Sequence, residues 1–139
     1  MDPTNDKMIY EEAQNCVRCG TCRVIYADRI KSKRFGVQCP PSTYYKVESF
    51  SPAGRMYTAV GIMRDQLPFN KRAVETFYAC TQCGYCQTMC EEYVEVQTMP
   101  VIEAMRARAV QEGIGPLPAQ KKNIENFKGN SRLYKEIQV

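Results

Sequence analysis

The chain has 139 residues, a net charge of +4, eight cysteines, and neither histidine nor tryptophan. This length suits one domain, and no apolar stretch approaches the roughly 20 residues needed to cross a bilayer. Without histidine, no Ser/His/Asp or Cys/His catalytic arrangement can form, and no GxGxxG or P-loop pattern is present. We therefore expect neither catalysis by the chain itself nor nucleotide binding.

Apolar residues at helical spacing predict five helices, over residues 4–14, 51–67, 70–78, 100–111 and 119–128. The second has the clearest start, since Ser51 fits an N-cap and Pro52 fits the first helical position. Pro68 ends that helix, the glycines and proline of residues 113–116 end the fourth, and Gly129-Asn130 closes the fifth. The pattern therefore predicts a mainly α fold.

Strand patterns are scarce, and the best candidate is the short segment Val94-Glu95-Val96. The long stretch between Cys22 and Cys80 is expected to be mainly helical. The predicted scaffold is therefore built of helices, with little or no sheet.

The eight cysteines form two near-copies of one pattern: Cys16, Cys19, Cys22 and, after a long gap, Cys39-Pro40; then Cys80, Cys83, Cys86 and Cys90. A Cys-x2-Cys-x2-Cys run places three thiolates on one short curling stretch, where they can bind three irons of a [4Fe-4S] cluster. In two-cluster proteins the remote fourth cysteine completes the other run's cluster. The pattern predicts two [4Fe-4S] clusters, cluster 1 held by Cys16, Cys19, Cys22 and Cys90, and cluster 2 by Cys80, Cys83, Cys86 and Cys39.

Three other uses of the cysteines fit the pattern less well. A structural zinc site usually has two separated Cys-x2-Cys pairs and lacks the third cysteine found in each run here. A disulfide framework suits a secreted chain, but residues 1–15 do not read as a signal peptide. A thioredoxin-like pair needs a βαβ setting, which is not evident. Iron–sulfur clusters are favoured, and zinc is the main alternative.

Eight free thiols fit a reducing cytoplasm better than an oxidising compartment. They also reduce an already modest apolar core, so the clusters should act as part of the core, and the apo-protein should be poorly folded. Lys31, Lys33 and Arg34 form either a solvated loop or a basic collar that steers an acidic partner. Positive charge does not form a stripe interleaved with aromatic residues, so nucleic acid is not expected as a partner.

The motifs carry a family resemblance. The two cysteine runs resemble those of the C-type iron–sulfur subunits of heterodisulfide reductase, and also the dicluster domain of its D-type subunits and the glycolate oxidase iron–sulfur subunits. Three softer motifs agree, namely Ser51-Pro-Ala-Gly-Arg55, Gly115-Pro-Leu-Pro118 and Gly129-Asn130. Two features depart from the family pattern. The segment 23–38 makes the gap before Cys39-Pro40 much longer than usual, and Glu91 rather than proline follows Cys90.

The resemblance implies a fold and a role. The fold would be a helical ferredoxin like that of succinate dehydrogenase iron–sulfur subunits, with residues 1–139 as one dicluster domain and residues 131–139 as a candidate partner-binding tail. The role would be to relay single electrons between two heterodisulfide reductase-like partners, an A-type flavin/iron–sulfur subunit and a B-type catalytic subunit with CCG motifs. This chain has no CCG segment, which implies that the catalytic module is another polypeptide.

Two other functions stay open. One is a free-standing soluble ferredoxin-type carrier, which needs little chain beyond its clusters. The other is a structural cluster or zinc module without redox turnover. The extra helical mass favours the first hypothesis, an electron-transfer subunit of a cytoplasmic oxidoreductase complex.

Overall fold

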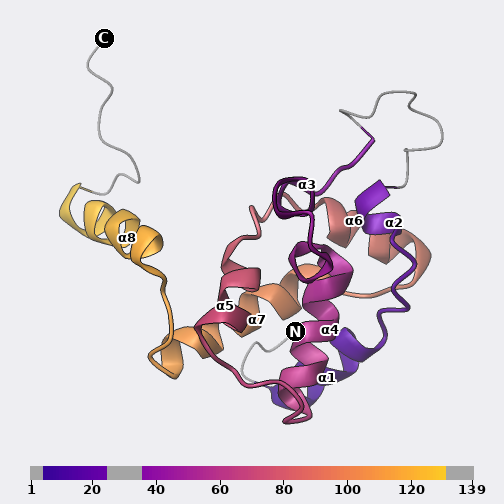
Figure 1. The fold of residues 1–139 in the computed structure, drawn as a ribbon, viewed down its shortest axis with the longest axis horizontal. Coiled ribbons are helices and arrows are strands. Elements are labelled where there is room, and N and C mark those ends of the chain that lie inside the picture. Colours follow the sequence, from indigo (N-terminus) through magenta and orange to yellow (C-terminus); the bar gives the residue numbers. More distant parts are fainter. Residues whose placement is uncertain (1–4, 25–35, 131–139) are drawn as a thin grey trace.

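The computed structural model describes residues 5–24 and 36–130, and over these ranges the chain forms α-helices and one 3₁₀ turn with no strand (Figure 1). The elements are α1 (Asp6–Gln14), α2 (Thr21–Val24), α3 (Pro40–Tyr45), the 3₁₀ turn η1 (Glu48–Phe50), α4 (Pro52–Met63), α5 (Lys71–Tyr78), α6 (Tyr85–Tyr93), α7 (Thr98–Gln111) and α8 (Pro118–Asn130). The mainly α fold is confirmed. Within these ranges no helix has the length and apolar character required to span a bilayer.

The main hydrophobic core lies where α1, α5 and α7 pack around α4 (Figure 1). Its members are mostly aliphatic: Ile9, Ala13, Met56, Ala59, Val60, Ile62, Phe77, Val101, Ile102, Ala104 and Met105. The small side chains of Ala59 and Ala104 are fully buried, which lets neighbouring helix backbones approach closely. This core holds the helices that lead into both cysteine runs, because α1 precedes Cys16 and α5 precedes Cys80.

A second, smaller core lies at the end of the molecule where α2 packs on α6 (Figure 1). Its buried members are Cys22, Cys86, Cys90 and Val96. Three of these four side chains are thiols, so this end of the fold has little aliphatic packing of its own.

The start of α4 is fixed by two contacts. The Ser51 hydroxyl accepts a hydrogen bond from the Gly54 amide at 3.0 Å and donates one to Glu48 Oε1 at 2.6 Å. A Cβ at position 54 would overlap the backbone carbonyl of Glu48, so only glycine allows α4 to lie this close to η1. The predicted N-cap is confirmed, and it anchors the first turn of α4 beside the segment that follows Cys39.

The five predicted helices are all present, but several boundaries differ from the prediction. Helix α1 begins at Asp6 instead of residue 4, and α8 runs through Gly129 and Asn130, so the prediction that these two residues close it is wrong. Helix α4 ends at Met63 instead of residue 67, because the Gly61 carbonyl accepts the amides of Gln66 and Leu67 and closes the helix. Helix α7 begins at Thr98, before Pro100, because proline is tolerated in a first turn, where amides need no intrahelical partner.

The predicted strand at Val94–Val96 is wrong. Glu95 has φ 55°, which breaks an extended conformation, and no strand pairs with it among the described residues. Val96 is 1% exposed because it packs against the buried thiols of the smaller core. The alternation of apolar and polar residues there reflects burial of a loop and not a sheet.

Two features of the sequence fall outside the described residues. One is the basic cluster Lys31, Lys33 and Arg34, and the other is the tail 131–139. Helix α8 leads toward that tail and extends away from the body of the molecule (Figure 1).

Candidate metal centres

The two cysteine runs adopt the same backbone conformation. Each begins just after a helix ends, with the amide of Cys16 donating to the Ala13 carbonyl and that of Cys80 to the Phe77 carbonyl. Each middle cysteine lies between two residues in left-handed backbone: Arg18 (φ 56°) and Gly20 (φ 77°) in the first run, Gln82 (φ 55°) and Gly84 (φ 78°) in the second. This pair of left-handed residues is what curls each run.

The same curl directs backbone N–H groups at sulfur. The Gln82 amide donates to Cys80 Sγ at 3.4 Å, and the Arg18 amide makes the corresponding bond to Cys16. Such bonds favour the thiolate form, which is the form that binds metal.

The third cysteine of each run lies on a helix and is buried. Cys22 is on α2, and Cys86 is on α6 with Cys90 one turn later. The middle cysteines, Cys19 and Cys83, are exposed. Each run therefore reaches from the interior to the surface.

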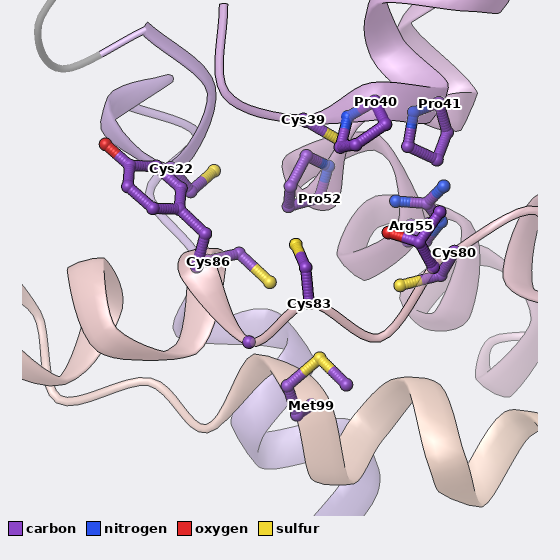
Figure 2. A pocket seen from close by; sticks show the side chains of 13 residues that line it. Cys22, Cys39, Pro40, Pro41, Pro52, Arg55, Cys80, Cys83, Cys86 and Met99 are labelled. Carbon is purple, nitrogen blue, oxygen red and sulfur yellow. The ribbon is translucent and has the colours of Figure 1, made fainter.

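The second run forms one wall of a pocket (Figure 2). Cys80, Cys83 and Cys86 line it from one side, and Cys39 projects into it from the opposite wall, at the start of α3. Pro40, Pro41, Pro52 and Met99 complete an apolar lining. The structure thus brings the remote Cys39 to the second run, although all of α3, α4 and α5 separates them in the sequence.

The first run meets the remote cysteine of the other half. Cys22 hydrogen-bonds Cys90, and the Cys90 thiol also interacts electrostatically with Cys16 and Cys19. The shared proton raises the pKa of Cys22 and lowers that of Cys90. Cys22 also lines the edge of the second run's pocket, so the two groups of thiols adjoin each other.

Burial controls the protonation of the other inner thiols. Desolvation raises the pKa of Cys16, and it raises that of Cys86 to about 11. The Thr98 hydroxyl donates to Cys86 Sγ at 3.2 Å and partly offsets this rise. Metal binding here must displace protons, so assembly of a metal centre should weaken as the pH falls.

No three Cys, Asp or Glu side chains in the described ranges converge closely enough to hold a single metal ion. The donor chemistry nevertheless fits iron–sulfur clusters, which are bound by four thiolates and benefit from apolar shielding. The pocket of the second run offers thiols among mostly apolar residues, together with the hydroxyl-bearing Thr81 and Tyr85, one buried guanidinium and no carboxylate. The cysteines of both groups could hold such clusters, with no nitrogen or carboxylate ligand needed.

The sequence analysis named Arg55 only as part of the motif Ser51-Pro-Ala-Gly-Arg55 and gave it no role at the site, but it lines the pocket of the second run and is 1% exposed (Figure 2). Its Nε donates to the Thr76 carbonyl at 2.7 Å, while its Nη2 has no hydrogen-bond partner. The signal in the sequence was a lone charge within the otherwise uncharged run of α4. Periodicity could not say what that charge faces.

Sequence reasoning also missed Arg106 on α7. Its guanidinium donates to the carbonyls of Phe77, Tyr78 and Cys80. These bonds close the end of α5 and hold the first cysteine of the second run in place. Nothing in the cysteine spacing pointed to this residue.

Comparisons with known proteins agree with this chemistry. The family described as the 4Fe-4S dicluster domain matches residues 12–113. The D subunits of the dihydromethanophenazine:CoB–CoM heterodisulfide reductases of Methanosarcina barkeri and Methanosarcina mazei are 28% and 27% identical over 121 residues, covering 78% of this chain. The chain spans only 27% of the length of each.

A shorter match links the chain to the B subunit of fumarate reductase (CoM/CoB) from Methanothermobacter marburgensis, which is 44% identical over 48 residues, or 34% of this chain and 10% of that protein. No solved structure matches. The resemblance to heterodisulfide reductase iron–sulfur proteins is confirmed, and so is an iron–sulfur, electron-transfer character. With the family match covering well over half of its residues, the chain belongs to the 4Fe-4S dicluster domain family.

Proposed function

We propose that this chain is the electron-transfer subunit of a heterodisulfide reductase-like oxidoreductase complex. The observation that carries the proposal is the pairing of each cysteine run with the remote cysteine of the other half. Cys39 faces the second run in one pocket, and Cys90 bonds to the third cysteine of the first run. Eight thiols in two adjoining groups suit two redox centres better than one binding site.

The chain would hold two [4Fe-4S] clusters. Cys16, Cys19, Cys22 and Cys90 would bind cluster 1, and Cys80, Cys83, Cys86 and Cys39 would bind cluster 2. Each cluster supplies a one-electron couple when bound. The protein's part is to hold the two thiol groups at a fixed separation and to keep water from their inner sides.

The exposed middle cysteines support a relay. Cys19 is the exposed thiol of the first group and Cys83 that of the second, while Cys22 and Cys86 are buried and interact electrostatically with each other. Each group therefore has one side at the surface, where a partner can approach, and one side toward the other group. This arrangement provides an entry and an exit for electrons.

The proposed partners are a CCG-type catalytic subunit like the B-type subunit of heterodisulfide reductase, and a flavin/iron–sulfur subunit like its A-type subunit. The names of the relatives, which are subunits of heterodisulfide reductase and of fumarate reductase, support an assignment to a multi-subunit reductase. The absence of a CCG segment from this chain is consistent with a separate catalytic polypeptide.

Anaerobic purification of the protein from its native source tests the assignment. We expect the chain to co-purify with a CCG-type protein, and Cys83→Ser to abolish electron flow through the complex while substrate binding by the partner is unchanged. Size exclusion giving only a species of the chain's own 15.9 kDa would indicate the free carrier instead. Clusters inert to dithionite would indicate a structural module, and substrate turnover by the isolated chain would contradict a non-catalytic role.

A further inference from the structure

Arg55 is the one fully buried charged side chain in the described parts of the chain. A guanidinium is always protonated in proteins, so this position carries a positive charge in the interior. Its Nε bonds to the neutral carbonyl of Thr76, and no ion pair within residues 5–24 and 36–130 includes it. Its Nη2 is buried with no acceptor.

An uncompensated buried charge is costly, because neither water nor a counter-ion offsets its desolvation. Such a group is retained where an anion compensates it. The pocket that Arg55 lines contains the thiols of Cys39, Cys80, Cys83 and Cys86, with Cys22 of the first group at its edge, and no carboxylate. Four thiolates around a cluster carry net negative charge, so they are the anion that the lining supplies.

The backbone holds Arg55 in this position. Gly54, its neighbour, lies against the Glu48 carbonyl so closely that no Cβ would fit, and the Ser51 cap fixes the same turn of α4. The Arg55 Nε is directed by the carbonyl of Thr76 on α5, the helix that leads into Cys80. The guanidinium therefore cannot turn away to solvent without repacking α4.

The first cysteine group has no equivalent among the described residues. Arg18 lies beside Cys16, but it is exposed and stacks over the Tyr57 ring at 4.8 Å. Water and salt screen an exposed charge far more than a buried one. Arg106 adds to the asymmetry, because its half-buried guanidinium contacts the Cys80 carbonyl of the second group.

We propose, on the basis of the proposed two-cluster function, that Arg55 sets the reduction potential of cluster 2, its Nη2 donating a hydrogen bond to a sulfur of that cluster. A positive charge and an N–H···S bond stabilise the more negative, reduced form. Cluster 2 is then the higher-potential centre. Electrons run from the Cys16 group to the Cys80 group, entering near Cys19 and leaving near Cys83.

An EPR-monitored redox titration of the anaerobically purified protein tests this, with dithionite as the one-electron donor. We call the EPR signal that Cys83→Ser alters the Cys83 signal, and the one that Cys19→Ser alters the Cys19 signal. In the unsubstituted protein, the Cys83 signal should form at a higher potential than the Cys19 signal. Arg55→Gln should lower the reduced-to-oxidised ratio of the Cys83 signal at least tenfold at a fixed potential, a shift of about 59 mV for one electron. The Cys19 signal should move much less.

Arg55→Lys keeps the charge and should recover most of that shift, which a purely structural role would not predict. Arg108→Gln is the matched control, since Arg108 bonds to Glu112 and Asp6 away from both cysteine groups, and it should move neither potential. The inference is overturned if Arg55→Gln shifts neither signal, or shifts both equally, or if the Cys19 signal has the higher potential in the unsubstituted protein. The two potentials in the unsubstituted protein can be compared even if Arg55→Gln fails to fold. Protein that contains no iron or sulfide would overturn the proposed function as well as this inference.

Discussion

The two cysteine runs have the same local backbone but different surroundings. Both curl through left-handed residues on either side of the middle cysteine, and both lead into a helix. The second run lies beside the buried Arg55 and the half-buried Arg106, whereas the charge beside the first run is exposed. Short-range sequence therefore builds two similar binding loops, and distant helices make them electrostatically unequal.

The largest effect is expected when one of the remote cysteines, Cys39 or Cys90, is replaced. Cys39→Ser should remove the same EPR signal as Cys83→Ser, and Cys90→Ser the same signal as Cys19→Ser, because in the proposed ligand sets each remote cysteine completes the other run's cluster. Iron should fall from about eight to about four per chain in each variant. If Cys39→Ser altered the Cys19 signal, the crossed pairing would be wrong while the number of clusters could stand.

The next largest effect is expected at Gly54. A Cβ there overlaps the Glu48 backbone, which cannot move as a side chain can, so Gly54→Ala should cost about 3 kcal/mol of unfolding free energy. It should also displace Arg55 and perturb the second cluster more than the first. Gly61→Ala is the control, because its Cβ would meet only the flexible Leu67 side chain. Equal destabilisation by both variants in denaturant titrations would contradict this account.

The equivalence of the two loops can be measured at their glycines. Gly20→Ala and Gly84→Ala both place a Cβ in left-handed backbone with open space around it, so each should destabilise by about 1–2 kcal/mol through strain alone. Gly129 in α8 also has open space and no positive φ, so Gly129→Ala should be neutral or slightly stabilising. Thermal unfolding of the three variants measures these losses of stability. Widely different losses for Gly20→Ala and Gly84→Ala would show that the two loops are not equivalent.

The smallest effect concerns the helix caps. Ser51→Ala removes a buried cap from α4 and should cost about 1–2 kcal/mol, whereas Asn70→Ala removes the exposed cap of α5 and should cost about 1 kcal/mol or less. Ser51→Ala should in addition alter the EPR signal of the second cluster, since it loosens the turn that carries Arg55. A change in the Cys19 signal alone would contradict that link.

The sequence predicted the helices well where start and stop signals are local. Ser51-Pro52 marked the start of α4, and α5 begins at Lys71, one residue after the predicted start at Asn70, which is its N-cap. Helix α6 was not predicted. Its inward positions are occupied by Cys86 and Cys90, which were interpreted as cluster ligands and not counted as the apolar residues of a helical pattern. The strand at Val94–Val96 failed for a related reason, since Val96 packs against those thiols and not against a sheet.

The cysteine spacing also predicted the chemistry of the site, but not its electrostatics. Spacing is a local property, so it defined the two runs. The assignment of Cys39 and Cys90 as the fourth ligands stays a prediction, which for Cys39 rests on the Cys39-Pro40 dipeptide after a long gap. The surroundings depend on which helices cross nearby. Neither Arg55 on α4 nor Arg106 on α7 is near the second run in the sequence, and only the fold brings them there.

Metal and acid-labile sulfide analysis of protein purified without oxygen tests whether the eight thiols hold two [4Fe-4S] clusters. We expect about eight irons and eight sulfides per chain, because two four-iron clusters use all eight cysteines. One or two zinc ions per chain with no sulfide would contradict this expectation.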